Sequence, residues 1–400
     1  MSVRKRKWTT AKGVEKEAWI VDYADTKGVR RLKTFAKKKD ADAFASKTDV
    51  EVREGVHVAD SETVTLKEAA ADWLKSCAAA GLERTTIDQY KQHVNLHIEP
   101  MIGATKLSKI TVPFVRAFQE KLRAEDRSSA MVKRVTVSLG SILSDAQERG
   151  LVVRNAVHEM SKRRGSGGAG KTDKRQKARL RYGVDIPTME EVRAIVGVQG
   201  RYRPFLVTAI FTGMRASELR GLAWADVDFD KAQIHVRRRA DRYHVIGMPK
   251  SDAGQRTIPM PPMVINTLKE WRLACPKGEH DLVFPNGEGN VEWHPNIIKR
   301  GLLPTLIKAG VTVTEKGEDG KPVIKAKYTG LHSLRHWFAS WCINSKADGG
   351  LELSPKAVQA RMGHSSIQIT FDTYGHLFPA VDEAQALADA ETRLFAVNAT

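Results

Sequence analysis

The chain has 400 residues, a mean hydropathy of −0.37 and 42% hydrophobic residues, which excludes wholesale disorder and favours two or three domains. Sixty-five Lys and Arg against 47 Asp and Glu give a net charge of +18, which favours a polyanionic partner such as nucleic acid. The three cysteines form no CxxC pair, so neither a zinc ribbon nor a disulfide framework is indicated. No apolar segment follows the basic start, and no run approaches the roughly 18 apolar residues of a membrane span. We therefore expect a cytoplasmic protein without a membrane partner.

Residues 1–60 are expected to form a small three-stranded β unit followed by a helix. Two strand-like runs, Trp19–Tyr23 and Val29–Phe35, flank a turn that contains glycine, and residues 37–53 have helical spacing. The segment carries 15 basic and 10 acidic residues. A basic β-ribbon can enter a DNA major groove, but an edge strand blunted by charge has the same pattern, so both interpretations stay open. The candidate DNA contacts are Arg30, Arg31 and Lys33.

Residues 61–160 predict a compact bundle of four amphipathic helices. Ser61 or Thr63 is the expected cap of the first helix, and Pro100 the expected stop of the second. The first expected helix starts near Ser61 or Thr63 and carries Leu66 to Leu74. The other three are expected from Thr85 to Ile98, from Thr111 to Arg123, and from Ser128 to Ala146.

Residues 161–185 are expected to be a basic, flexible linker. Positions 161–182 carry nine basic residues and one acidic residue around a Gly/Ser core. The segment is either a solvated spacer or one that follows DNA phosphates, and its charge favours the second. The candidate contacts are Arg163, Arg164, Lys171, Lys174 and Arg175.

The same segment contains a match to the Walker A expression, Gly165-x4-Gly170-Lys171-Thr172. A P-loop needs a buried strand before it and an amphipathic helix after it. Charged residues lie on both sides of this match instead. We therefore interpret it as part of the linker rather than as a nucleotide site.

Residues 186–400 are expected to form a third, mixed α/β domain. Residues 187–191 look like a capping box, and Phe205–Phe211 is the most apolar run of the chain. Helices are expected after three short strands. These strands are Ile234–Val236, Val245–Met248 and Thr257–Met260, with 250–255 as the turn between the last two. The whole chain is thus predicted to be α+β and mainly helical, with a small antiparallel sheet in this domain.

Several side chains of this domain suit phosphodiester chemistry without a metal, in which cations must balance the charge on the phosphate oxygens. Arg215 directly follows the apolar run and has Glu218 as a partner three residues on. His332 and Arg335 share one helix face, although such a pair is more often exposed on the surface without a specific function.

A histidine and a tyrosine complete the candidate set. His364 follows a glycine, and Tyr374 comes ten residues later. A phenol is a weak nucleophile at its ordinary pKa of about 10, and a lone tyrosine is more often a core residue. Neighbouring cations would favour its deprotonation.

Each motif is weak by itself, but their order closely resembles that of the tyrosine recombinase (phage integrase) family. The resemblance covers residues 186–380, and layout extends it to the helical core-binding domain at 61–160 and a small arm-binding domain at 1–60, as in prophage and integrative-element integrases. The motifs are Thr212-Gly213-Met214-Arg215-Ala216-Ser217-Glu218-Leu219, Pro249-Lys250-Ser251-x-Ala253-Gly254-x-Arg256, His332-x-x-Arg335-His336, Gly363-His364-Ser365-Ser366 and Tyr374.

The resemblance implies a site-specific recombinase with a role for each of six residues. Tyr374 would attack the scissile phosphate to form a 3′-phosphotyrosyl intermediate, and Lys250 would be the general acid for the departing 5′-oxygen. Arg215 and Arg335 would hold the phosphate oxygens. His332 would be the proton acceptor or a phosphate ligand, and His364 a further phosphate ligand. Neither ATP nor a metal cofactor is needed.

The implied partners are double-stranded DNA attachment sites, a homotetramer of the protein on DNA, an accessory DNA-bending protein and an excisionase. Two alternatives remain: relaxation without strand exchange, as in type IB topoisomerases, and a catalytically silent DNA-binding regulator. Residues 311–328 depart from the family pattern as an extra hairpin, and Met362 replaces the usual leucine. The helical tail carries Phe378, Leu387, Leu394 and Phe395, which either dock on a neighbouring subunit or pack on their own domain.

Overall fold

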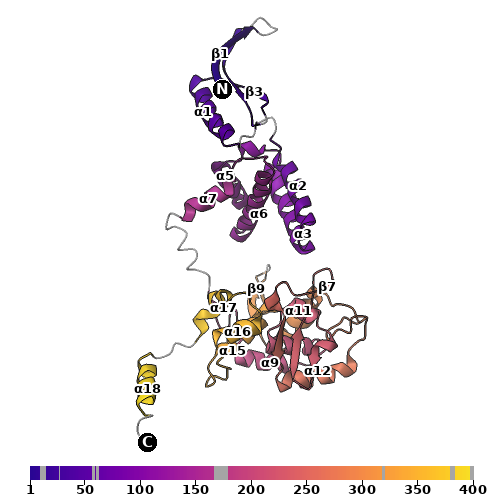
Figure 1. The fold of residues 1–400 in the computed structure, drawn as a ribbon. Helices are drawn as coiled ribbons and strands as arrows, with labels where there is room; N and C mark the ends of the chain where they lie inside the picture. The colour runs from indigo at the N-terminus through magenta and orange to yellow at the C-terminus, as the bar shows by residue number, and fades with distance from the viewer. Residues whose placement is uncertain are drawn as a thin grey trace. The chain divides into compact units, whose positions relative to one another are not determined.

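The computed structural model describes residues 1–9, 15–26, 28–55, 59, 63–165, 179–317, 320–378 and 383–396 (Figure 1). The chain divides into two compact units, residues 1–176 and 177–400. Helices predominate, and the strands of the described ranges form small antiparallel sheets, which confirms the expected α+β class. No helix in these ranges is both long and apolar enough to cross a membrane.

The chain begins with a three-stranded antiparallel sheet of β1 (Ser2–Thr9), β2 (Glu15–Ala24) and β3 (Arg30–Phe35), in that order. Helix α1 (Lys38–Arg53) covers one face. Val3 pairs with Val21, which pairs with Lys33, so the odd-numbered residues of all three strands face α1. The even-numbered residues form the opposite face, called the open face here, where Ile20 is buried and most of the other residues are exposed. The two predicted strands and the helix are confirmed, and β1 is the third strand.

A helical bundle follows, with α6 at its centre. Leu139 and Ile142 of α6 are fully buried among residues of the other helices. The helices are α2 (Leu66–Ala79), α3 (Arg84–His93), α4 (Glu99–Ile102), α5 (Val112–Ala124), α6 (Ser129–Glu148) and α7 (Ala156–Gly165).

The predicted cap of the first bundle helix was wrong. Thr65 caps α2, because the Glu68 amide donates to its hydroxyl at 3.3 Å and its own amide donates to the Glu68 carboxylate at 2.8 Å. Thr63 instead donates its hydroxyl to the carbonyl of Leu151, and Ser61 lies outside the described residues. The glutamate three residues after Thr65 decides the position.

The predicted stop at Pro100 was also wrong. A π-helical turn, Val94–Ile98, joins α3 to α4, and Pro100 lies in the first turn of α4. The altered hydrogen-bond spacing of a π turn accommodates a residue that lacks an N–H group and would break a regular α-helix. Continuing the helix buries both Ile98 and Ile102.

The bundle has a further helix that the sequence analysis did not separate from the linker. The side-chain amide of Asn155 donates to the carbonyl of Gly140 at 2.8 Å, and its oxygen accepts from the amide of Val157, which ties α7 to α6. Helix α7 continues to Gly165, inside the expected linker. A helix, not a buried strand, therefore precedes the Walker A match. Residues 166–178, which hold the rest of the match, lie outside the described residues.

The second unit is built around α10 (Arg203–Thr212), which packs between α12 (Pro262–Ala274) and α15 (His332–Ile343). Its apolar side chains are buried all round, including Phe205 and Ile210. The remaining helices are α9 (Met189–Gly197), α11 (Ala216–Arg220), α13 (His294–Asn296), α14 (Leu303–Lys308), α16 (Pro355–Met362), α17 (Ile367–Tyr374) and α18 (Glu383–Ala396). The predicted capping box is present, with Thr188 as the cap and Glu191 as its partner.

The strands of this unit differ from the prediction in how they pair. β4 (Val227–Asp228), β5 (Gln233–Val236) and β8 (Arg256–Pro259) form one sheet, whereas β6 (Arg239–Ala240) and β7 (Ile246–Gly247) form a separate hairpin. Asp241 closes that hairpin, since its carboxylate accepts from the amides of Tyr243 and Val245. Residues 250–255 therefore connect two sheets and are not a turn between paired strands. The predicted extra hairpin is present as β9 (Thr312–Lys316) and β10 (Pro322–Ala326).

Candidate active site

The end of α10 directs the chain toward Arg215. Gly213 ends the helix in the left-handed conformation (φ +59°), and a β-carbon there would clash with the ring of Phe338. Only glycine meets both conditions. Arg215 follows as the N-cap residue of α11, with its side chain 38% exposed.

Arg215 is held by a carboxylate and by a helix-end carbonyl. Its Nη1 donates to Glu218 at 2.8 Å, which confirms the predicted partner, and its Nη2 donates to the carbonyl of Gly363 at 2.9 Å. Glu218 is 2% exposed, and burial alone would raise its pKa. Hydrogen bonds and charge from Arg256 and Arg215 outweigh burial and hold the pKa of this carboxyl below its usual value.

Arg256 is a buried residue that holds other residues of the site in place. It belongs to one of the sequence motifs, but no role was predicted for it. Its Nη2 donates to Glu218 at 2.8 Å, and its Nε donates to the carbonyl of Arg361 at the end of α16. Gly363 ends α16 with φ +63°, and a β-carbon there would lie 2.8 Å from Nη1 of Arg256. Arg256 thus fixes both Glu218 and the turn that leads to His364.

Arg335 is the most deeply buried cation of the site, at 4% exposure. It projects from the first turn of α15 and donates to the carbonyls of Gly213 and Met362. Helix C-termini carry partial negative charge, so these carbonyls stabilise a buried guanidinium. Burial, together with the cation of Arg215, lowers the pKa of Arg335 to about 9. The ends of α10 and α16 therefore present both predicted arginines at one place.

Three histidines lie around these cations. Burial and the guanidiniums of Arg335 and Arg215 lower the pKa of His332, although its ring reaches solvent. His364 is buried, and its Nδ1 lies 2.9 Å from the hydroxyl of Thr370. Burial and the same cations lower the pKa of His364 to about 4. Both imidazoles are consequently neutral at pH 7 in the absence of an anion.

Tyr374 is the last residue of α17 and is only 2% exposed. Its hydroxyl lies 2.8 Å from Nδ1 of His336, and its ring lies nearly parallel to that of His364, with 6.2 Å between centroids. Burial raises the pKa of Tyr374 to about 12, although Arg335 and Arg215 act to lower it. The nucleophile candidate therefore rests as a neutral phenol beside cations.

Lys250 is the remaining member of the predicted set. It lies exposed on the loop between β7 and β8. Gly254 approaches Pro249 so closely that a β-carbon would lie 2.6 Å from Pro249 Cβ, which closes the loop. The carbonyl of Gly254 accepts from Arg256, so the loop is attached to the cluster at its base.

Sequence reasoning missed the roles of Arg256 and His336. His336 stands beside Arg335 and four residues after His332, and this helical spacing was the available signal. The sequence signal for Arg256 was weaker: an arginine between a turn glycine and a buried strand residue. Its role could not be predicted from that pattern, because burial of its side chain depends on α16, about a hundred residues later.

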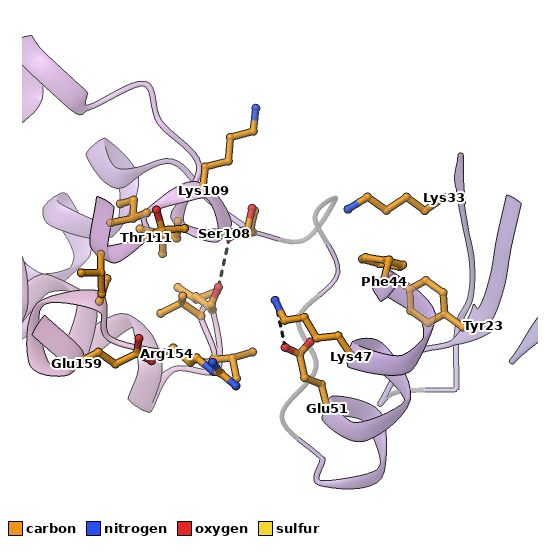
Figure 2. Close-up of a pocket in the computed structure, with 18 residues that line it drawn as sticks. Tyr23, Lys33, Phe44, Lys47, Glu51, Ser108, Lys109, Thr111, Arg154 and Glu159 are labelled. Atoms are coloured by element: carbon orange, nitrogen blue, oxygen red, sulfur yellow. Dashed lines mark hydrogen bonds and ion pairs between the residues drawn. The ribbon is translucent and has the colours of Figure 1, made fainter. Parts of the chain in front are cut away.

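The three candidate DNA contacts of the N-terminal sheet do not share one face. Arg30 lies on the open face, where it pairs with Asp22. Arg31 and Lys33 lie on the face toward α1: Arg31 pairs with Asp25 at 2.9 Å, and the Lys33 ammonium lies 4.3 Å from the ring centroid of Phe44. Figure 2 shows Lys33 beside Phe44 and Tyr23 at a hollow whose lining includes none of the six site candidates.

The candidate contacts of the linker cannot be placed. Arg163 and Arg164 belong to the last turn of α7, but only their backbone is described. Lys171, Lys174 and Arg175 lie outside the described residues.

Comparison with protein families gives two matches. Residues 189–380 match the phage integrase family, and residues 65–123 match the phage integrase N-terminal SAM-like domain. The first match spans Arg215, Arg335 and Tyr374 together with the other residues of the cluster described above.

Similar proteins cover most of the chain. The tyrosine recombinase XerC-like protein of Caldanaerobacter subterraneus subsp. tengcongensis is 25% identical over 369 residues, which cover 86% of each chain. The ICEBs1 integrase of Bacillus subtilis is 22% identical over 324 residues, covering 80% of this chain and 81% of the relative.

Two solved structures share the fold. The Tn1549 transposon integrase in complex with a circular intermediate DNA has a TM-score of 0.60 at 19% identity, covering 83% of this chain and all of that one. A lambda integrase dimer bound to a COC′ core site has a TM-score of 0.54 at 16% identity, covering 94% of this chain and 97% of that one.

Proposed function

Because the chain belongs to the phage integrase family of tyrosine recombinases, we propose that it cuts and rejoins double-stranded DNA at attachment sites, integrating and excising a prophage or other mobile element. The substrate is the phosphodiester backbone. The reaction exchanges one phosphoester for another and so conserves the energy of the bond, which removes the need for ATP.

The observation that carries this proposal is the excess of positive charge around Tyr374. Three guanidiniums, of Arg215, Arg256 and Arg335, lie near the carboxylate of Glu218, which accepts hydrogen bonds from Arg215 and Arg256. Arg335 instead donates to neutral carbonyls, which balance its charge only in part. An anion is therefore favoured beside these groups, and a scissile phosphate bound by Arg215 and Arg335 would supply it.

Each residue of the predicted set then has a chemical task. The Tyr374 oxygen attacks phosphorus, the bond from phosphorus to the 5′-oxygen breaks, and Lys250 gives that oxygen a proton. Arg215 and Arg335 stabilise the charge that develops on the non-bridging oxygens, while His332 and His364 add hydrogen bonds to the phosphate. Attack by the 5′-hydroxyl of a partner strand on the phosphotyrosyl bond completes the exchange.

For the cluster to contact the scissile phosphate, other parts of the protein must bind the DNA duplex. On the N-terminal sheet we assign this task to the open face, which carries Arg4, Arg6, Lys16 and Arg30. Arg31 and Lys33 lie on the other face, toward α1, so this proposal does not assign them to the duplex. The helical bundle and the basic linker would complete the grip on the backbone.

Exchange between two duplexes requires four active sites, so we propose a homotetramer on DNA. We propose that helix α18 makes the contact between subunits. Leu387 and Leu394 lie seven residues apart on one face of this helix, and each is 70% exposed. The lambda integrase tetramer bound to a Holliday junction shares the fold, with a TM-score of 0.52. An accessory DNA-bending protein and an excisionase belong to the same proposal, as does action in the bacterial cytoplasm.

A plasmid that carries the two junctions of the element encoding this protein, as direct repeats, tests the function when the accessory DNA-bending protein and the excisionase of this proposal are supplied. A recombinase deletes the segment between the repeats and leaves two circles. Relaxation of supercoils without deletion would instead support the topoisomerase-like alternative, and binding without either change would support a silent regulator.

A further inference from the structure

His336 is a polar side chain of the site that the six-residue set leaves out. It follows Arg335 on α15, is partly buried, and places Nδ1 2.8 Å from the hydroxyl oxygen of Tyr374. We propose that His336 is the group that receives the phenolic proton of Tyr374 when its oxygen attacks phosphorus. This inference rests on the proposed function, since it assumes that Tyr374 is the nucleophile.

The other two histidines are placed for different contacts. His364 meets the face of the Tyr374 ring, with an angle of 11° between the planes, and its Nδ1 is bonded to Thr370. His332 lies against His336, with ring centroids 4.9 Å apart and perpendicular planes. His336 is therefore the histidine that reaches the reacting oxygen. The family resemblance implied that His332 is either the proton acceptor or a phosphate ligand. In this proposal His336 is the proton acceptor and His332 is a phosphate ligand.

The protonation state of His336 fits an acceptor. Burial, His332 and Arg335 lower its pKa to about 4, against a small opposing effect of Asp185, so the ring is neutral at pH 7. A neutral ring that carries its proton on Nε2 offers Nδ1 as an acceptor. A phosphate bound nearby would raise the pKa of His336, because its negative charge offsets the surrounding cations.

Proton transfer must accompany the attack. Burial raises the pKa of Tyr374 to about 12, so a free phenolate is rare at rest. The phenolic oxygen becomes far more acidic as its bond to phosphorus forms, and a neutral imidazole in hydrogen-bond contact can then take the proton. The new bond joins Tyr374 oxygen to phosphorus and the broken bond releases the 5′-oxygen, which is protonated by Lys250. On rejoining, the proton returns from His336 to Tyr374.

The test measures single-turnover cleavage of a nicked duplex that carries the element's junction and traps the covalent product. His336→Asn keeps a hydrogen-bonding group where Nδ1 was but cannot hold a proton. We expect its cleavage rate to fall at least about 100-fold, with duplex affinity and melting temperature unchanged. His280→Asn makes the same exchange at an exposed position of the same unit and should cleave like the parent protein.

Two rescue measurements separate proton transfer from packing. Replacing Tyr374 by 3-fluorotyrosine, a more acidic phenol, should restore part of the activity of His336→Asn. A duplex with sulfur in place of the 5′-oxygen, a leaving group that needs no acid, should rescue Lys250→Ala but not His336→Asn. Where His336→Asn melts early, His336→Gln takes its place in the same measurements.

The outcomes are distinct. Cleavage by His336→Asn within about threefold of the parent, or no recovery with 3-fluorotyrosine, would overturn this inference and leave the proposed function intact. Absence of a covalent product from the parent protein would overturn the proposed function itself.

Discussion

Arg256 and Glu218 form a buried ion pair, with Nη2 of the arginine 2.8 Å from Oε2 of the carboxylate and both side chains less than a tenth exposed. The same carboxylate holds Arg215. Glu218 is therefore the residue through which the buried Arg256 fixes the partly exposed Arg215.

Removing that carboxylate should cost stability and activity together. Glu218→Ala leaves Arg256 buried without its charge partner, and loss of one partner of a buried pair typically costs about 3–5 kcal/mol. Urea unfolding followed by tryptophan fluorescence measures the loss. An unfolding free energy within about 1 kcal/mol of the parent would contradict the assigned role.

The same pair gives a pH dependence with a defined sign. The folded pKa of Glu218 is lowered, so its stabilising contribution is fully present above the unfolded value of about 4.3 and is lost as the pH falls through the folded value. Glu218→Gln should flatten the acid side of the stability profile.

Gly213 should tolerate no side chain. Gly213→Ala would place a β-carbon against Phe338 at φ +59°, so we expect a loss of at least about 2 kcal/mol, visible as a lower melting temperature. Gly197→Ala is the matched control, because no atom lies within 4 Å of its added β-carbon and the residue ends a helix. Its stability should be unchanged or higher by up to about 1 kcal/mol. Equal melting temperatures for the two variants would refute the packing argument.

The open face of the N-terminal sheet should bind DNA more than the face toward α1. Arg6→Gln and Arg30→Gln should each weaken binding of the whole protein to a mixed-sequence duplex and lower the salt dependence by about one phosphate contact. Lys33→Gln is the control, since Lys33 lies over Phe44. Titration at several salt concentrations decides the matter, and an equal effect of Lys33→Gln would reject the assignment of faces.

The tail should affect assembly and not the chemistry of one site. Truncation after Ala380, or the double change Leu387→Ser and Leu394→Ser, should abolish recombination of the plasmid while leaving the covalent product on a single nicked duplex. Glu391→Gln changes an exposed polar residue of the same helix and should recombine normally. Unchanged recombination after truncation would mean that α18 is dispensable for assembly.

Much of this architecture could be predicted from local patterns. The order of the motifs around Arg215, Arg335 and Tyr374 identified the family, and the glutamate three residues after Thr188 identified the start of α9. Helical spacing located most helices of the bundle, and residues 311–328, which depart from the family pattern, predicted the hairpin of β9 and β10.

What could not be predicted depends on contacts between distant residues. The bond from His336 to Tyr374 spans 38 positions, and burial of Arg256 depends on the carbonyl of Arg361. Helix continuation past Pro100 depends on burial of Ile102. Local sequence patterns do not predict these tertiary contacts.

The covalent product is the most direct test of the account. The intact protein, incubated with a nicked duplex carrying its element's junction and then digested, should yield one peptide joined through Tyr374 to a 3′-phosphate, with a free 5′-hydroxyl on the other strand end. Tyr374→Phe should yield none, while still binding the duplex. A product joined through another residue, or one that persists in Tyr374→Phe, would contradict the assignment of Tyr374 as the nucleophile.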